Sequence, residues 1–112
     1  MRPRDWRTCG AGRKLYNMAE PIRSVRLRIQ GRVQGVWYRG WAVVQAQELG
    51  LSGWVRNRQD GSVEALVSGA ETQLRAMIER CRRGPPAARV DAVLEEVADE
   101  PVRSGFRQLP TL

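Results

Sequence analysis

The chain has 112 residues, of which 42% are hydrophobic, and this is enough for one domain with a single core. It contains no histidine, which excludes histidine-based catalytic triads, histidine metal ligands and histidine acid–base catalysis. Its two cysteines, Cys9 and Cys81, make neither a disulfide framework nor a metal site, and no apolar run approaches the ~18 residues of a membrane span. The net charge of +7 favours anionic partners without distinguishing a small phosphate from a nucleic acid.

Residues 1–20 lack helical or strand periodicity and carry +3 of the net charge of +7. We expect a disordered extension there, followed by a folded domain at residues 21–112. Met18, just before the first patterned segment, is an alternative native start, and a basic tail that binds nucleic acid is a second interpretation. The segment has no hydrophobic stretch of the kind found in secretory signals, so we expect a cytoplasmic protein.

The patterned region opens with a half-buried strand and a helix. From Ser24 to Gln30 apolar and polar residues alternate, as they do in a strand with one buried face. A loop containing Gly31 and Gly35 follows. Beyond it, six residues starting at Tyr38 recur at i, i+3, i+4, i+7, i+8 and i+11, which is the spacing of one face of a helix. Gly50 ends this helix. The residues of that face are Tyr38, Trp41, Ala42, Gln45, Ala46 and Leu49.

The chain then returns through a hairpin. Residues 51–57 read as a second strand, and residues 62–68 alternate as a third. Between them, Asp60 and Gly61 are a typical hairpin turn signal.

A second helix and two further strands complete the domain. The helix spans residues 71–82, and the glycine and prolines at 84–86 stop it. The fourth strand, at residues 89–97, alternates imperfectly, which predicts a bulge near Asp91 and Ala92. A short edge strand is expected at residues 105–109. The helical stripe consists of Leu74, Met77, Ile78 and Cys81, so we expect Cys81 to be a buried apolar side chain.

The predicted order is β-α-β-β-α-β with an extra C-terminal edge strand. Right-handed crossovers place both helices on the same face of the sheet. An antiparallel sheet with two helices on one face is the ferredoxin-like α+β sandwich. We expect the other face to be solvated, because only alternate strand residues are apolar.

The loop before the first helix has the composition of an anion site. Gly31 and Gly35 allow backbone conformations in which consecutive N–H groups converge on one anion, and the helix start adds positive partial charge. Arg39 stands in the first helical turn, where its planar guanidinium can reach two phosphate oxygens. On spacing alone, an ordinary glycine-containing turn with a solvated arginine is an equal alternative.

Asn57, at the end of the second strand, is the other candidate site residue. Asparagine at such a place is most often a turn former, but its carboxamide can also hold a water through one donor and one acceptor. The topology does not require the second strand to adjoin the first, so the approach of Asn57 to the loop is an inference.

Two stretches resemble the signatures of the acylphosphatase family. The first is Ile29–Arg39 (IQGRVQGVWYR), and the second is Gly53–Asn57 (GWVRN), followed by Gly61, Val63 and Gly69 at their spacings. The resemblance covers about residues 22–110 and implies a ferredoxin-like fold that hydrolyses acyl phosphates. It implies that Arg39 binds the phosphate, that Asn57 orients the attacking water, and that backbone amides form a cradle. The cradle residues are Gln34, Gly35, Val36, Trp37, Tyr38 and Arg39.

Further expectations follow from this resemblance. The substrate is a small acyl phosphate, no metal or other cofactor takes part, and the protein is a monomer. The family usually has phenylalanine where this chain has Tyr38, whose hydroxyl needs a partner if it is buried. We expect tolerated packing and retained activity.

The chemistry of acyl phosphates suits a chain without histidine. The carboxylate that leaves has a conjugate acid with a pKa near ~4 to 5, so its departure needs no general acid. Asp60 and Glu64 are the acids nearest to Asn57 in sequence, and we expect neither to be a general base. The proton of the water then passes to a phosphate oxygen.

Three other functions have weaker support in the sequence. An RNA-binding ferredoxin-like module would need an aromatic-rich sheet face, and the strands offer at most Arg26, Arg28 and Trp54. An acylphosphatase-like domain of a larger maturation enzyme would be accompanied by cysteine-rich zinc modules, which this chain lacks. A silent phosphate-binding regulator is disfavoured because both Arg39 and Asn57 are present.

Overall fold

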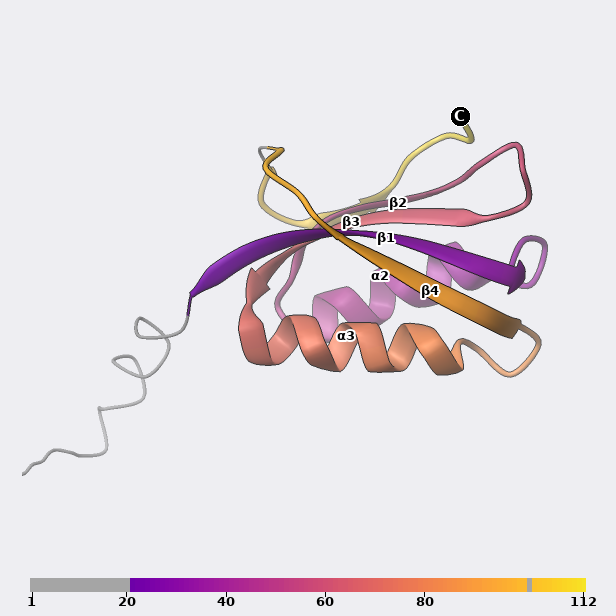
Figure 1. Cartoon of the computed structure of the whole chain (residues 1–112), viewed down its shortest axis with the longest axis horizontal. Coiled ribbons are helices and arrows are strands. Elements are labelled where there is room, and N and C mark those ends of the chain that lie inside the picture. The colour runs from indigo at the N-terminus through magenta and orange to yellow at the C-terminus, as the bar shows by residue number, and fades with distance from the viewer. Residues whose placement is uncertain (1–20, 101) are drawn as a thin grey trace, which may run out of the picture.

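The computed structural model describes residues 21–100 and 102–112, and the predicted disordered extension at residues 1–20 lies outside them (Figure 1). The order of elements is the predicted one, with boundaries that differ by at most two residues from expectation. The elements are β1 (Ile22–Arg32), α2 (Tyr38–Glu48), β2 (Ser52–Asn57), β3 (Val63–Ala70), α3 (Glu71–Arg83), β4 (Arg89–Val97) and β5 (Phe106–Gln108).

The five strands form one sheet in the order β4-β1-β3-β2-β5, and both helices lie against the same face (Figure 1). Strand β1 pairs antiparallel with β3 and β4, and β2 pairs antiparallel with β3. This confirms the ferredoxin-like α+β fold. The edge strand β5 differs from a purely antiparallel arrangement, because it pairs parallel with β2 and makes the sheet mixed. After β4, at one edge of the sheet, the chain crosses to the opposite edge. There it forms β5, which runs in the same direction as β2.

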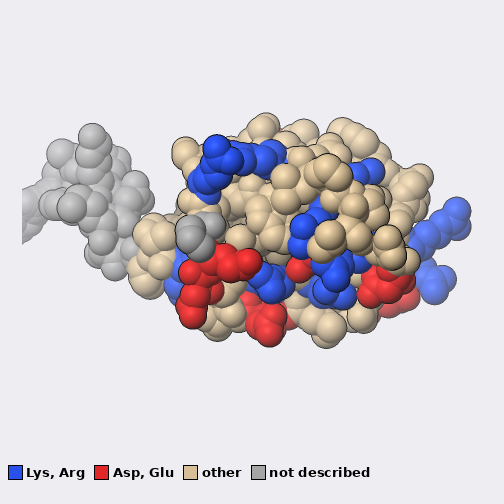
Figure 2. Space-filling view, turned by 90° about the horizontal axis from the view of Figure 1, so that it is seen from above, with Lys and Arg blue, Asp and Glu red and all other residues tan. Residues whose placement is uncertain are grey.

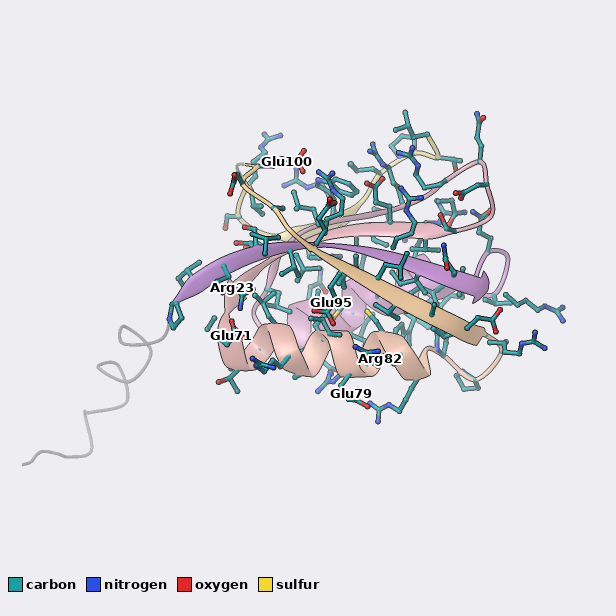
Figure 3. All side chains as sticks on the ribbon, viewed as in Figure 1. Arg23, Glu71, Glu79, Arg82, Glu95 and Glu100 are labelled. Carbon is teal, nitrogen blue, oxygen red and sulfur yellow. The ribbon has the colours of Figure 1, made fainter. Side chains whose placement is uncertain are left out.

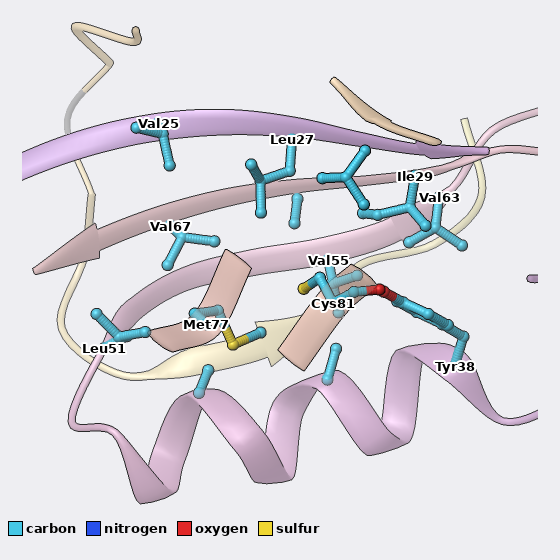
Figure 4. Close-up of a cluster of buried hydrophobic side chains, with 14 of the residues drawn as sticks. Val25, Leu27, Ile29, Tyr38, Leu51, Val55, Val63, Val67, Met77 and Cys81 are labelled. Carbon is cyan, nitrogen blue, oxygen red and sulfur yellow. The ribbon is translucent and has the colours of Figure 1, made fainter. Parts of the chain in front are cut away.

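The core lies between the sheet and the two helices (Figure 4). The alternating residues of β1 and β3 point into it, as the sequence pattern predicted. Each buried leucine or isoleucine contributes about 1.5–3 kcal/mol relative to an exposed one. The helices contribute Tyr38, Ala42 and Ala46 from α2, and Leu74, Met77 and Cys81 from α3. The strands contribute Val25, Leu27, Ile29, Val63, Ala65 and Val67.

The predicted bulge in β4 is present. Gln30 of β1 lies opposite Ala92, whereas Gly31 lies opposite Val90, so Asp91 is the extra residue. Gly31 has a φ of +130°, and a Cβ atom at this position would collide with the carbonyl oxygen of Arg89. The glycine therefore permits the close approach of two backbones at the bulge. Its role here is to allow β1 to pair with the edge strand β4.

The sheet face opposite the helices carries interspersed acidic and basic side chains (Figure 2). It is less solvated than expected, since Glu64 is only 4% exposed. The Glu64 carboxylate accepts hydrogen bonds from Arg56 Nε and Arg58 Nη1, both at 3.1 Å, and Arg26 Nε lies 3.5 Å away. A buried carboxylate requires such compensation. Three arginines thus enclose one acid on the central strand of the sheet.

Ion pairs connect α3 to the strands above it (Figure 3). Arg23 Nη1 lies 2.6 Å from Glu71 Oε1, and Arg82 Nη2 lies 3.1 Å from Glu95 Oε2. These side chains also line a surface hollow of about 340 Å³. The charges around this hollow neutralise one another, so it has no excess attraction for an anion.

The hydroxyl of Tyr38 has the hydrogen-bond partner that a buried tyrosine requires. It donates a hydrogen bond of 2.7 Å to the carbonyl oxygen of Cys81 near the end of α3 (Figure 4). That carbonyl would ordinarily accept from the N–H of residue 85, but residue 85 is a proline and has none. Burial raises the pKa of Tyr38 far above its ordinary value, so the hydroxyl remains a donor. Tyr38 therefore satisfies a helix-end carbonyl that the helix cannot satisfy itself.

Replacing Tyr38 with phenylalanine should destabilise the protein, although phenylalanine is the usual residue in the family that the sequence resembles. The carbonyl of Cys81 would lose its partner in a buried position, at a cost of about 1–3 kcal/mol. Urea unfolding of Tyr38→Phe, followed by circular dichroism, should show a lower midpoint with an unchanged m-value. A midpoint equal to or above that of the parent would show that this hydrogen bond does not stabilise the fold.

Candidate active site

A small cavity of about 110 Å³ lies where the start of α2 faces the end of β2. It brings together the two sequence stretches that were singled out. Among the residues around it, Arg39 comes from the first stretch and Asn57 from the second. The lining consists of Val33, Gly35, Trp37, Tyr38, Arg39, Gly40, Asn57 and Gln108.

The loop between β1 and α2 is anchored at one end and sharply turned at the other. Val33 is buried in the core and holds the beginning of the loop. Gly35 and Trp37 both have left-handed backbones, with φ of +76° and +65°. This conformation is uncommon for a residue other than glycine and costs on the order of 1 kcal/mol or more for Trp37. Trp37 is the N-cap of α2, so its strained turn sets the direction in which the helix begins.

The first turn of α2 lines the cavity and has backbone donors without acceptors in the helix. The first hydrogen bond closing the helix runs from the N–H of Trp41 to the carbonyl of Trp37, at 3.0 Å. The N–H groups of Tyr38, Arg39 and Gly40 therefore have no acceptor inside the helix, and all three residues line the cavity. A helix N-terminus carries positive partial charge, and such a group of donors is suited to an anion.

Arg39 is the charged residue of the cavity, and no acid lines it. Within the described part of the chain its guanidinium has no ion pair or hydrogen bond with a side chain. Its five donors are therefore available for an anion that also accepts from the helix start.

Asn57 faces this positive region with a buried acceptor. Its Oδ1 atom is buried and has no hydrogen-bond partner among the described residues. An unpaired buried acceptor is unfavourable by about 1–3 kcal/mol, and a donor entering the cavity would satisfy it. The backbone of Asn57 is held in place, because its carbonyl accepts from the N–H of Leu112 at 3.1 Å.

The structure separates the predicted loop residues into two groups. Gly35, Trp37, Tyr38 and Arg39 line the cavity together with Asn57, whereas Gln34 and Val36 are not part of its lining. The side chain of Gln34 turns instead to the β2–β3 hairpin, where it donates to the carbonyls of Arg58 and Ser62.

The cavity also contains residues that the sequence did not indicate. Gln108 reaches it because the parallel pairing of β5 places Gln108 opposite Val55, two positions before Asn57. Gly40 lies beneath the indole of Trp37, where a Cβ atom would collide with the ring. The expected short edge strand was the only signal for Gln108, and it did not specify the partner strand.

The two acids nearest to Asn57 in sequence lie away from the cavity. Asp60 Oδ1 accepts from the N–H and the hydroxyl of Ser62, at 2.9 and 2.6 Å. These hydrogen bonds lower the pKa of Asp60, and Arg28 adds a smaller effect of the same sign. Glu64 is occupied by arginines on the opposite face of the sheet. Neither carboxylate is among the residues that line the cavity.

Comparison with known proteins identifies the family. The acylphosphatase family model matches residues 25–108. The chain belongs to the acylphosphatase family. An acylphosphatase from Rhizorhabdus wittichii is 56% identical over 89 residues, covering 78% of this chain and 88% of the relative. One from Rhodospirillum rubrum is 53% identical over 91 residues, covering 81% of this chain and all of the relative. The structure of an acylphosphatase from Coxiella burnetii superimposes with a TM-score of 0.76 at 33% identity, covering 79% of this chain and 93% of that one.

Two features are absent from the described residues. No three histidine, cysteine, aspartate or glutamate side chains in this part of the chain are placed to share a metal ion. No helix of residues 21–100 or 102–112 combines the length and the apolar composition that crossing a bilayer requires.

Replacing Gly40 with alanine should disturb the cavity without unfolding the helix. Alanine favours a helix by about 1 kcal/mol over glycine, but its Cβ would displace the indole of Trp37. We expect the affinity for inorganic phosphate, measured by titration calorimetry, to fall on the order of 10-fold, which is about 1.4 kcal/mol. Val44→Ala, at an exposed position of the same helix, should leave it unchanged. Equal affinities in both variants would show that the indole does not shape the anion site.

Proposed function

We propose that the protein is a metal-independent acylphosphatase, which hydrolyses small acyl phosphates to a carboxylate and inorganic phosphate. The observation that carries the proposal is the cavity itself. On one side it has Arg39 and the free N–H groups of the helix start, and on the other the buried, unpaired Oδ1 of Asn57. The first side suits a phosphate and the second suits a water.

Binding of the phosphoryl group requires only this chain's donors. The amides at the start of α2 and the guanidinium of Arg39 would hold its non-bridging oxygens, which carry the charge in both the ground state and the transition state. The donors are set in advance by the helix and the strained turn at Trp37, so little reorganisation accompanies the reaction.

Attack by water would be directed by Asn57. The carboxamide oxygen accepts a hydrogen bond from the water and holds it in line with the scissile bond. A bond forms between the water oxygen and phosphorus while the bond from phosphorus to the acyl oxygen breaks. The electron pair of that bond leaves with the carboxylate, and a proton of the water passes to a phosphate oxygen.

The leaving group explains why the cavity needs no acid. The conjugate acid of a carboxylate has a pKa near ~4 to 5, so the group departs as an anion at neutral pH. Ordinary phosphate monoesters expel an alkoxide, which is far more basic, and this lining offers no group to protonate it. The chemistry of the lining therefore favours acyl phosphates over monoesters.

The alternative of RNA binding has weaker support. The open sheet face carries Trp54, but the guanidinium of Arg56 covers its ring at 4.5 Å from the centroid. Base stacking needs a free aromatic surface. We further propose that the protein is cytoplasmic. We also propose that it is active as a monomer, since one chain supplies every residue proposed to act.

Substitution of the two central residues should separate binding from water positioning. In Asn57→Ala we expect kcat for benzoyl phosphate to fall about 10²–10³-fold, with little change in inhibition by inorganic phosphate. In Arg39→Ala both the rate and phosphate inhibition should weaken. Arg75→Ala, at an exposed arginine of α3, is the matched control and should behave as the parent. Near-parental kcat in folded Asn57→Ala would refute its proposed role.

Metal independence is tested separately. Turnover of benzoyl phosphate should be the same before and after dialysis against EDTA, because the proposed charge stabilisation comes from Arg39 and backbone amides. A loss of rate that Mg²⁺ restores would contradict the proposal.

A further inference from the structure

The side chain of Gln34 connects the phosphate loop to the hairpin that carries Asn57. Its Nε2 atom donates to the carbonyl oxygen of Arg58 at 2.7 Å and to that of Ser62 at 2.8 Å. Both acceptors are carbonyls, and only the NH₂ group of the amide can donate to two of them. The chemistry of the partners therefore fixes the orientation of the carboxamide.

The two acceptors sit at the neck of the hairpin. The N–H of Arg58 donates to the carbonyl of Ser62 at 2.8 Å, and the N–H of Gly61 donates to the carbonyl of Arg58 at 3.1 Å. Gln34 thus binds a turn that its own backbone hydrogen bonds already stabilise. This turn begins one residue after Asn57. A displacement of this turn would displace Asn57 with it.

This connection is direct, whereas the sheet connects the two parts indirectly. Strands β1 and β2 do not pair, because β3 lies between them. In the described part of the chain, the hydrogen bonds between residues 33–39 and 57–62 are the two from Gln34. The distance between the loop and Asn57 therefore depends on this amide, on core packing and on the pairing of both strands with β3.

We propose that Gln34 is a positioning residue, whose side chain holds Asn57 at the correct distance from the phosphate bound by the loop. The inference rests on the proposed function. A small misplacement of a catalytic group can cost about 10²-fold in rate while the binding groups stay in place. Loss of the Gln34 side chain should therefore affect the placement of water more than the binding of phosphate.

The first test compares Gln34→Met with Gln47→Met. Methionine keeps the length of the side chain and removes its donors, and Gln47 is an exposed glutamine on α2. In Gln34→Met we expect kcat for benzoyl phosphate to fall about 10- to 100-fold, with inhibition by inorganic phosphate within about 2-fold of the parent. Gln47→Met should match the parent in both. Unchanged kcat, or a parallel loss of phosphate inhibition, would overturn the inference. If Gln34→Met does not fold, Gln34→Glu replaces the donors by an oxygen at the same length.

A double-mutant cycle separates positioning from a general loss of structure. If Gln34 acts through Asn57, adding Gln34→Met to Asn57→Ala should lower kcat by no more than about 2-fold. An equally large loss in both backgrounds would mean that Gln34 acts elsewhere, and would refute the proposal while leaving the role of Asn57 intact.

Amide hydrogen exchange tests the connection without relying on turnover. The amides of Arg58 and Gly61 should exchange faster in Gln34→Met than in Gln47→Met, because the turn that they close loses its anchor to the loop and opens more often. Equal exchange would contradict the inference. If the parent has no acylphosphatase activity, the proposed function fails, and exchange alone decides whether Gln34 holds the hairpin.

Discussion

Three backbone N–H groups at the start of α2 have no acceptor within the helix, and the geometry of the site depends on where they point. The residues that carry them line a cavity that contains Arg39 and no acid. The direction is set by the left-handed backbone of Trp37 and by the burial of Val33, which together turn the chain from the end of β1 into the helix. An anion is the ligand that satisfies these donors, and because they belong to secondary structure they are in position before it arrives.

The sheet topology brings the second half of the site to this position. Strand β3 separates β1 from β2, so the loop after β1 and the hairpin after β2 lie at one end of the sheet without pairing with each other. Asn57 therefore approaches the helix start across a gap. The hairpin is held on three sides: by β3 through pairing, by the C-terminal segment through the N–H of Leu112, and by the loop through Gln34. The cavity lies between the hairpin held in this way and the start of α2.

The parts that sequence predicted are those governed by periodicity. Alternation identified β1 and β3, the apolar stripe of α3 placed Cys81 in the core, and broken alternation identified the bulge at Asp91. The parts it missed depend on contacts between distant segments. The strand order gave no means of placing Gln108 beside Asn57. Gln34 was expected in the cradle, and nothing in the sequence indicated that its side chain bonds to the hairpin. Periodicity reports which side of the sheet a residue faces, so Glu64 was expected on a solvated face. It does not report that neighbouring arginines cover that side. The roles of Arg39 and Asn57 came from the family resemblance and remain proposals.

Tyr38 links the start of α2, which lines the cavity, to the core through a hydroxyl that a phenylalanine would lack. Its backbone N–H belongs to the donors at the cavity, while its hydroxyl reaches the carbonyl of Cys81 on α3. The two helices are otherwise held together by apolar packing and by the contacts of Arg80 with Gln45 and Glu48. A directional hydrogen bond from the first residue of α2 restricts rotation of the helix start more than apolar contact does. Because Pro85 leaves that carbonyl without a helical partner, the tyrosine completes α3 and orients α2 with one interaction.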